Sequence, residues 1–313
     1  MFKKFSSTTL IIILVLLSGL VILNKFYFSE KKESTFNDSF VKIDTSQVSE
    51  IYIYPKAEKG KEIRMTRQAK GWEASFEKTK TMADSAAVRN LLGSFVEIKA
   101  NALAGADQSS WTELQVSDTG GSRIKLVTSD NKTYDMVVGK FGYNAAARNG
   151  VTYIRHENED ATYAIDGFLA FTVNQPFSGW RNKTIISGNK DNWKSLTFTY
   201  PGDSSFVLAR QNKGWLINGQ TADSSKTAQF LNSLGSIRIN GFVDAYTPVS
   251  TPVYTLSIEG NNLSAPITIV AYAADSVQKF ILHSSLNPDA YFSEAQSHIF
   301  ERVFAVRENF VTK

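Results

Sequence analysis

The amino-acid sequence predicts an α+β protein in which an N-terminal transmembrane helix precedes two tandem, repeat-related modules of mainly antiparallel sheet with packed helices. Three observations carry this prediction: a long uncharged apolar segment near the amino terminus, short runs that alternate between apolar and polar residues, and a Lys-Gly-Trp sequence that occurs twice. The composition agrees, because 42% hydrophobic and 20% charged residues are typical of a globular protein. A length of 313 residues suits two domains.

The apolar segment is long enough to cross a bilayer. Residues 5–24 carry no charge, and twenty helical residues span about 30 Å. A cleaved signal peptide would need small residues before a cut site, and residues 22–26 offer none. A buried core helix is the other alternative, but so continuous an apolar run at the terminus favours an uncleaved anchor. We therefore predict a short tail at residues 1–4, a transmembrane signal anchor at 5–28 and a linker at 29–44.

The orientation of this anchor is not fixed by the positive charges alone. Basic residues lie on both sides of the segment: Lys3, Lys4, Lys25, Lys31 and Lys32. The order of charged start, apolar run and long polar remainder is that of an export signal. We therefore expect a cytoplasmic N-terminus in the bacterial inner membrane, with the bulk of the chain extracytoplasmic or periplasmic.

Charge and cysteine content exclude several classes of function. Of the formal net charge of +4, three units come from Lys3, Lys4 and Lys25, so residues 29–313 are close to neutral. A nucleic-acid-binding surface needs concentrated basic residues, and the chain has no such cluster. The absence of cysteine removes disulfides, thiol nucleophiles and zinc–thiolate sites.

An internal repeat divides the remainder of the chain. Lys70-Gly71-Trp72 recurs as Lys213-Gly214-Trp215, and each copy is followed by an Asp-Ser pair that suits a helix start. At an offset of 139 residues, Leu92 matches Leu231. We therefore predict a first module at residues 45–187 and a second at 188–313.

The elements of the first module follow from its periodicity. Strands are expected where apolar and polar residues alternate, and then around Trp72. Asp84 should cap a helix whose apolar face is formed by Val88, Leu91, Leu92 and Phe95. A closing helical segment should pack Phe168, Phe171 and Val173 inward. The expected strands lie at residues 50–54, 62–66, 124–127, 133–138, 151–155 and 161–165.

The second module repeats this order. Asp223 should cap the equivalent helix, and a last helix should pack Ile299, Phe300, Val303 and Phe304 inward. The expected strands lie at residues 194–200, 205–210, 253–258, 267–271, 278–283 and 290–292.

Several short motifs resemble a known bacterial family. They are Val138-Gly139, Thr152-Tyr153-Ile154-Arg155, Thr162-Tyr163-Ala164 and Trp180-Arg181-Asn182-Lys183-Thr184-Ile185. Together with the anchor and the Gly-Trp strand, they resemble the domain of unknown function 4340 over about residues 45–312. The second copy keeps only Arg307 of the Arg-x-Lys ending. The resemblance implies a membrane-associated protein without an assigned activity. It also implies, by association, an accessory role beside an ABC-type transporter.

The residues that could carry chemistry have simpler structural interpretations. His156, followed by acidic residues at 157, 159 and 160, superficially resembles a metal site, but a polar hairpin turn explains it better. His283 should end a strand and His298 should lie on the last helix. The glycines of residues 139–142 predict a turn, and Asp84 and Glu97 are expected on a helix as a cap and a solvated position. We predict no catalytic, cofactor-binding or metal-binding residue and no cofactor.

Two function hypotheses remain open. The favoured one is a non-enzymatic interaction or accessory module, anchored through residues 5–28, with a protein partner in the cell envelope such as an ABC-type transporter, and without nucleic acid. The alternative is a module that binds envelope glycans or lipids, with an enzyme as a third possibility. Trp72 and Trp215 could stack on sugar rings, but we expect both to be structural anchors of their modules.

Overall fold

The computed structural model describes residues 39–145, 148–212, 214–274, 279–293 and 298–312. The predicted tail and anchor, residues 1–28, lie outside these ranges. Among the residues that the structure describes, no helix is long and apolar enough to cross a membrane. The described chain is mostly antiparallel sheet with a few helices, so the α+β class is confirmed.

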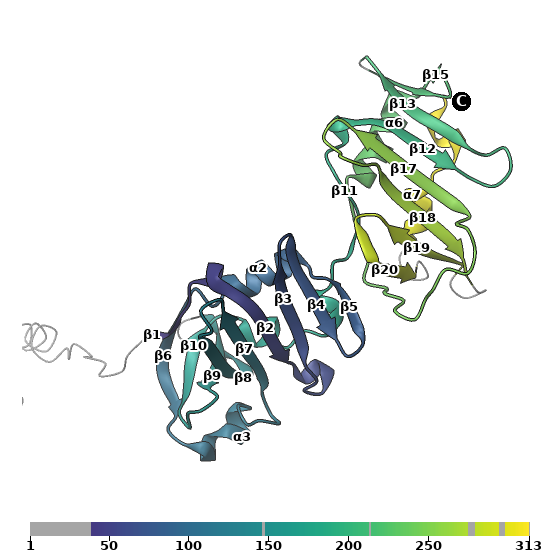
Figure 1. Cartoon of the computed structure of the whole chain (residues 1–313). Helices are drawn as coiled ribbons and strands as arrows, with labels where there is room; N and C mark the ends of the chain where they lie inside the picture. Colours follow the sequence, from purple (N-terminus) through teal and green to yellow (C-terminus); the bar gives the residue numbers. More distant parts are fainter. Residues whose placement is uncertain (1–38, 146–147, 213, 275–278, 294–297, 313) are drawn as a thin grey trace, which may run out of the picture.

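The first half of the chain forms one ten-stranded antiparallel sheet (Figure 1). Alternation of buried and exposed residues, as in β7, shows one face on the core and one toward solvent. In spatial order the strands are β1 Ser39–Lys42, β6 Glu97–Gly105, β10 Thr162–Asp166, β9 Asn149–His156, β8 Thr133–Asn144, β7 Ser122–Thr128, β2 Val48–Tyr54, β3 Ile63–Gln68, β4 Gly71–Phe76 and β5 Thr79–Met82.

The second half forms an eight-stranded antiparallel sheet and a separate two-stranded pair. In spatial order the large sheet contains β15 Gln220–Thr221, β14 Gly214–Ile217, β13 Phe206–Gln211, β12 Trp193–Thr199, β17 Tyr254–Gly260, β18 Ile267–Ala273, β19 Phe280–Ser284 and β20 Asn287–Ser293. The pair consists of β11 Thr184–Ser187 and β16 Ser236–Arg238.

The helices are short. The two longest, α2 Ser85–Gly93 and α6 Ser224–Leu234, begin after Asp84 and Asp223 as predicted, because each carboxylate accepts hydrogen bonds from two free backbone N–H groups. The remaining α-helices are α3 Trp111–Leu114, α4 Leu169–Val173, α5 Phe177–Trp180 and α7 Ile299–Val303. The 3₁₀ turns are Thr45–Gln47, Lys56–Glu58, Gln108–Ser110, Lys190–Asn192 and Arg307–Phe310.

The strand order of the two halves corresponds element by element. Counting from β1 and from β11, each half runs edge strand, 3₁₀ turn, four strands, helix, then five strands, and the first half adds α3 and the 3₁₀ turns Lys56–Glu58 and Gln108–Ser110 between its strands. The order β9-β8-β7-β2-β3-β4-β5 of the first sheet matches β19-β18-β17-β12-β13-β14-β15 of the second. Where β6 pairs with β10, the second half has only a bridge from Phe242 to Phe292 in β20.

Each sheet covers its own hydrophobic core. The first core holds the face of α2 that was predicted from Val88, Leu91, Leu92 and Phe95, together with Trp180. The second holds Leu231, Trp193 and Phe292 beside α6 and α7. Ile299, Val303 and Phe304 are buried as expected, and Phe300 packs on the same core.

The structure corrects two boundaries of the predicted organisation. Residues 39–42, assigned to the linker, form β1, which pairs with β6 and buries Phe40 and Val41. Residues 184–187, assigned to the first module, form β11, which pairs with β16 of the second half. Ile185 and Ile186 belong to the second core. In both cases a four-residue strand is too short to give a clear alternating pattern.

Three further expectations are wrong. Phe168 and Phe171 do not pack inward: they are 62% and 58% exposed, and only Val173 of that set is buried. The glycines of residues 139–142 lie within β8, where the pairing with β9 is interrupted by a bulge instead of ending in a turn. Glu97 begins β6 and does not lie on the helix.

Two ion pairs join the two halves, and each half supplies the arginine of one pair and the aspartate of the other. Arg181, just after α5, binds Asp244 of the second half with N–O distances of 3.0 and 2.7 Å, and its side chain is only 3% exposed. Arg238 of β16 binds Asp84, the cap of α2 in the first half. In addition, β5 lies against β20 (Figure 1). The junction is therefore a packed, charge-paired contact.

Candidate functional site

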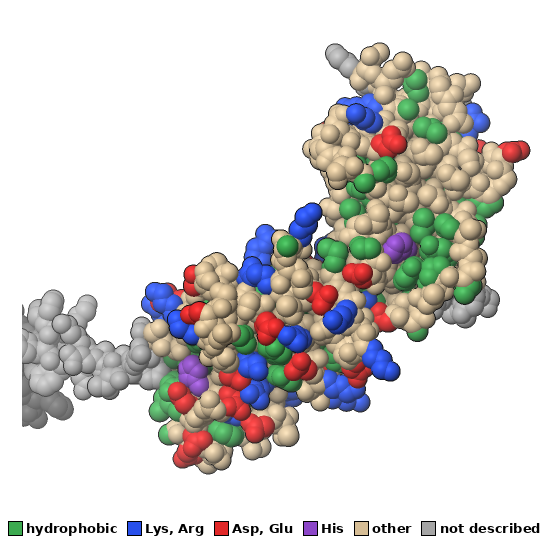
Figure 2. Space-filling model, viewed as in Figure 1, with side chains coloured by type: hydrophobic (Ala, Val, Ile, Leu, Met, Phe, Trp, Pro, Cys, Tyr) green, Lys and Arg blue, Asp and Glu red, His purple; other side chains and the backbone are tan. Residues whose placement is uncertain are grey.

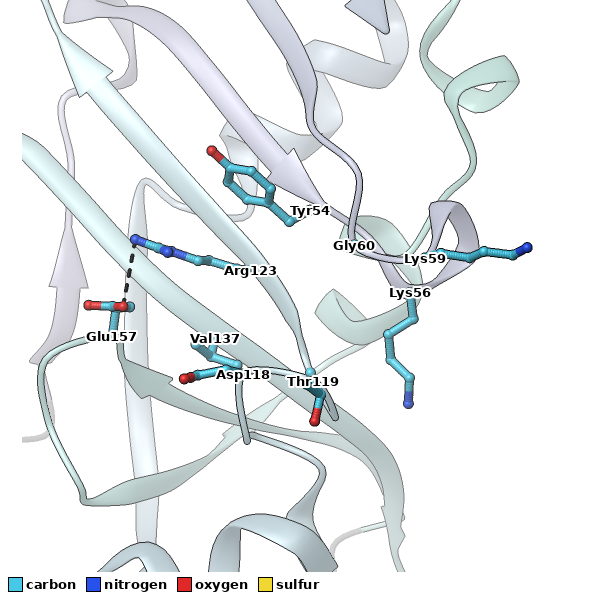
Figure 3. Close-up of a pocket in the computed structure, with 10 residues that line it drawn as sticks. Tyr54, Lys56, Lys59, Gly60, Asp118, Thr119, Arg123, Val137 and Glu157 are labelled. Carbon is cyan, nitrogen blue, oxygen red and sulfur yellow. Dashed lines mark ion pairs between the residues drawn. The ribbon is translucent and has the colours of Figure 1, made fainter. Parts of the chain in front are cut away.

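The best-formed cavity lies in the first half beside β2, β7 and β8 (Figure 3). Its volume of about 530 Å³ is within the range of small-molecule sites. It is lined by charged and polar side chains from several elements: Tyr54, Lys56, Lys59, Gly60, Asp118, Thr119, Gly121, Arg123, Val137 and Glu157.

The polar groups of this cavity are largely engaged by neighbouring side chains. Arg123 donates to both carboxylate oxygens of Asp135 at 2.8 and 2.7 Å and lies 3.7 Å from Glu157. Tyr54 donates to Glu62 at 2.6 Å, and burial together with that bond raises the pKa of Tyr54 to about 12. Figure 3 shows Lys59 directed away from Arg123. The polar groups therefore do not converge on one point where a ligand would sit.

Arg155 fixes one wall of the cavity. This residue is 1% exposed, and its guanidinium donates to the carbonyls of Val116 at 2.7 Å and Glu157 at 2.6 Å and to Asp118 at 2.8 Å. Its Cζ also lies 3.9 Å from the ring centroid of Trp111. Because Arg155 holds both Asp118 and the backbone at Glu157, it is a positioning residue for this surface.

A second candidate surface lies on the outer face of the second sheet. Three tyrosines and a histidine form it: Tyr246 from the loop before β17, Tyr272 of β18, His283 of β19 and Tyr291 of β20. The Tyr246 ring centroid lies 5.9 Å from that of Tyr272 and 5.2 Å from that of Tyr291. His283 stacks on Tyr291 at 4.8 Å. We call these four residues the tyrosine face.

The tyrosine face presents neutral polar groups. The Nδ1 atom of His283 lies 3.0 Å from the carbonyl oxygen of Ala290. Because a carbonyl oxygen can only accept, Nδ1 is the donor of this hydrogen bond, and Nε2 faces away from it. Burial raises the pKa values of Tyr246 and Tyr272, so both hydroxyls stay neutral.

The strand positions beside the tyrosine face on β17 and β18 are uncharged, whereas acidic residues stand two positions before Tyr246 and Tyr291: Asp244, which pairs with Arg181, and the exposed Asp289. The neighbouring outward positions of β17 and β18 are Thr255, Ser257, Thr268 and Val270, which alternate with buried residues. Figure 2 shows hydrophobic side chains gathered with a histidine over this end of the second sheet, while charged side chains crowd the first half. The two halves therefore differ in surface chemistry although their strand orders correspond.

The histidines singled out in the sequence are not brought together. His156 ends β9 instead of lying in the turn, and its ring stacks on Phe40 at 4.2 Å. Asp160 of the same turn accepts a hydrogen bond from Gln108 at 2.9 Å. His298 is exposed and precedes α7. Within the described ranges, no three His, Asp or Glu side chains are grouped so that they could hold a metal ion.

The two repeated tryptophans occupy equivalent strands but are buried to different degrees. Trp72 of β4 is 8% exposed, and the Cζ atom of Arg67 lies 4.6 Å from its ring centroid. Trp215 of β14 is half-buried and packs against the second core. Both positions suit side chains that cover the gap between sheet and helix.

Sequence reasoning did not find the tyrosine face. Its members are separated by 8 to 26 residues and come from four segments, so no local motif joins them. The signal that was available is the alternation of β18, which places Tyr272 on the side of the strand opposite to its buried residues Ile267, Ile269 and Ala271.

Comparison with known proteins identifies a protein family but no individual related protein. No curated protein and no solved structure matches the chain. The family described as domain of unknown function (DUF4340) matches residues 75–257, a stretch that runs from β4 of the first sheet to β17 of the second. Since this match covers more than half of the chain, the protein belongs to the DUF4340 family.

Proposed function

We propose that the protein is a single-pass, membrane-anchored extracytoplasmic interaction module of the bacterial inner membrane. Residues 5–28 are the anchor, the N-terminus is cytoplasmic, and the two halves are modules related by an internal repeat. The protein has no catalytic role of its own and serves as an accessory subunit of an envelope complex, such as one built around an ABC-type transporter. The uncharged anchor sequence and the corresponding strand orders support this proposal.

The tyrosine face carries the interaction part of the proposal. Centres of protein interfaces are depleted of charged residues and rich in tyrosine, because an aromatic body and a hydroxyl combine large contact area with hydrogen bonding. Tyr246, Tyr272 and Tyr291 lie together on such an aromatic surface. The partner surface should therefore be apolar with neutral hydrogen-bonding groups.

The junction supports the same function. The first half follows the proposed anchor directly, and the second half carries the tyrosine face. The Arg181–Asp244 and Arg238–Asp84 ion pairs join these two halves. Because the ion pairs hold the two halves together, the tyrosine face keeps one orientation relative to the first half. This preorganisation lowers the conformational entropy that is lost when a partner binds.

Site-specific photocrosslinking in native membranes tests this function. A benzophenone amino acid in place of Tyr272 keeps an aromatic side chain on the face, and the same probe at Val207 of β13, which is 38% exposed, is the control. We expect a discrete protein adduct from position 272 that is lost when Tyr246 and Tyr291 are changed to Ser. Adducts of equal yield from both positions would contradict the proposal.

An envelope glycan is the alternative ligand for the same surface. Aromatic faces stack on the apolar faces of sugar rings, while the tyrosine hydroxyls and Nε2 of His283 could bond to sugar hydroxyls. Digestion of the adduct separates the two: a protease-sensitive adduct supports the protein partner, and a glycosidase-sensitive adduct supports the glycan.

A further inference from the structure

A cluster of exposed phenylalanines lies on the first half of the protein. Phe168 and Phe171, from the start of α4, are more than half exposed, and they pack against Phe141 of β8. The ring centroid of Phe141 lies 5.3 Å from that of Phe168 and 4.8 Å from that of Phe171. Tyr143, two residues along β8, is 66% exposed. We call Phe141, Tyr143, Phe168 and Phe171 the phenylalanine patch.

Two glycines position this patch. A Cβ atom at Gly150 of β9 would lie 2.6 Å from the ring of Phe141 and 3.1 Å from that of Phe168, so only glycine leaves room for both rings over the strand. Gly167 has a φ of +105°, a conformation that favours glycine, and its N–H donates to the carbonyl of Gly150 at 2.8 Å. The backbone is thus arranged to hold aromatic rings at the surface.

The patch lies at the same end of the strands as the point where the chain enters the first sheet. Ser39, the first residue of β1, pairs with Lys99 of β6. Lys99 and Phe168 line the same cavity, of about 560 Å³, between the start of β6 and the end of β10. Further along this row of the sheet, Asp166 of β10 pairs with Val151 of β9, which pairs with Gly142 of β8, between Phe141 and Tyr143. Ser39 therefore lies at the same end of the strands as the patch, although β8 is four strands away from β1.

The tether between anchor and sheet is short. Residues 29–38 are ten residues, which span at most about 33–36 Å when fully extended. A domain of about 145 residues has a radius of gyration of roughly 15 Å. The tether therefore keeps the edge that contains β1 within about one domain diameter of the bilayer.

We propose that the phenylalanine patch is a second membrane contact, which lies on the lipid surface and fixes the orientation of the first half. Phenylalanines on the surface of a tethered domain enter the boundary between headgroups and acyl chains, where apolar area leaves water. This inference rests on the proposed anchor at residues 5–28. It concerns a different surface from the tyrosine face, and the bilayer is what binds to it.

Spin labelling measures the depth of the patch directly. Because the chain has no cysteine, Tyr143→Cys provides a single label beside an intact set of phenylalanines, and Val249→Cys provides the control label. The full chain is reconstituted in protein-free vesicles of phosphatidylethanolamine and phosphatidylglycerol. Flotation first establishes that the chain is inserted, and the label depth is then determined from collisions with oxygen and with a polar relaxant.

The expected label depth at position 143 is about 5–10 Å inside the headgroup–acyl boundary, while the label at 249 stays in water. The Phe168→Ser, Phe171→Ser double variant should return the 143 label to water without loss of flotation. These side chains are largely exposed, so its circular dichroism should match that of the parent.

Two results would overturn the inference in different ways. A chain that floats while its 143 label is as water-exposed as the 249 label contradicts the membrane contact and leaves the anchor intact. Such a result would point to a protein as the occupant of the patch. A chain that does not float at all contradicts the anchor, and with it both proposals.

Discussion

How much a side chain contributes to this fold depends more on how deeply it is buried than on its residue type. Trp72 and Trp215 share a motif, yet the first is 8% exposed and the second only half-buried. Arg155, at 1% exposure, satisfies three backbone carbonyls and Asp118 with one planar group.

The two tryptophans should stabilise the fold unequally. Trp72→Ala removes a buried aromatic side chain and should reduce the free energy of unfolding by about 3–5 kcal/mol. Trp215→Ala should cost about 1–3 kcal/mol, because part of that ring already contacts water. Thermal unfolding of the detergent-solubilised full chain measures both, with Met82→Ala, at a partly exposed strand position, as the control. Unchanged stability in both tryptophan variants would show that they are not structural anchors.

Alkaline pH should destabilise the first half through Tyr54. Its pKa is raised to about 12 in the folded chain by burial and by the bond to Glu62, against 10 for an ordinary tyrosine. The favourable contribution is therefore complete below pH 10 and is lost as the pH rises toward 12, because the unfolded chain releases the proton first. Tyr54→Phe should flatten the fall in unfolding temperature over this window. An identical fall in the variant would mean that Tyr54 does not contribute to it.

At the scale of helices and strands, two sequence signals predicted the elements correctly: the alternation of apolar and polar residues in strands, and aspartates that cap helices. The strands that contain Ile51 and Ile53, and later Leu196 and Phe198, were predictable because each alternates between a buried and a solvated side. The helices after Asp84 and Asp223 were predictable because a carboxylate satisfies free N–H groups at a helix start.

Other elements could not be predicted for identifiable reasons. The bulge in β8 looks like a turn in the sequence because its glycines resemble turn residues. In the fold, however, Gly139 leaves room for the carbonyl of Leu114, which a Cβ would approach to 2.3 Å. Phe168 and Phe171 have the spacing of a buried face, but both rings pack on Phe141 at the surface and stay largely exposed. The tyrosine face is assembled by the sheet from four distant segments, so only the topology reveals it.

The two helix caps should respond differently to one substitution. Asparagine caps a helix about as well as aspartate, so Asp223→Asn should change stability by less than about 0.5 kcal/mol. Asp84→Asn should cost about 1–2 kcal/mol, because this mostly buried carboxylate also pairs with Arg238 across the junction. Urea unfolding of the two variants makes the comparison. Equal losses would contradict a role of Asp84 in the junction.

At the scale of the whole molecule, one topology is used twice with different surfaces. The first half carries dense charge and the phenylalanine patch, and the second carries the tyrosine face. The correspondence of strand order keeps the core and the helix caps alike, while the outward positions are free to diverge. The two ion pairs at the junction then hold the phenylalanine patch and the tyrosine face in one relative orientation.

Cysteine accessibility in cells tests most directly the central claim, that this two-sheet body is held outside the inner membrane by an uncleaved anchor. Phe2→Cys and Val249→Cys each give a single thiol in a chain that has none. In intact spheroplasts a membrane-impermeant maleimide should label position 249 at once and position 2 only after the membrane is permeabilised, with both proteins retained in carbonate-washed membranes. Protection of position 249 until lysis, or release of the protein by the wash, would contradict the account.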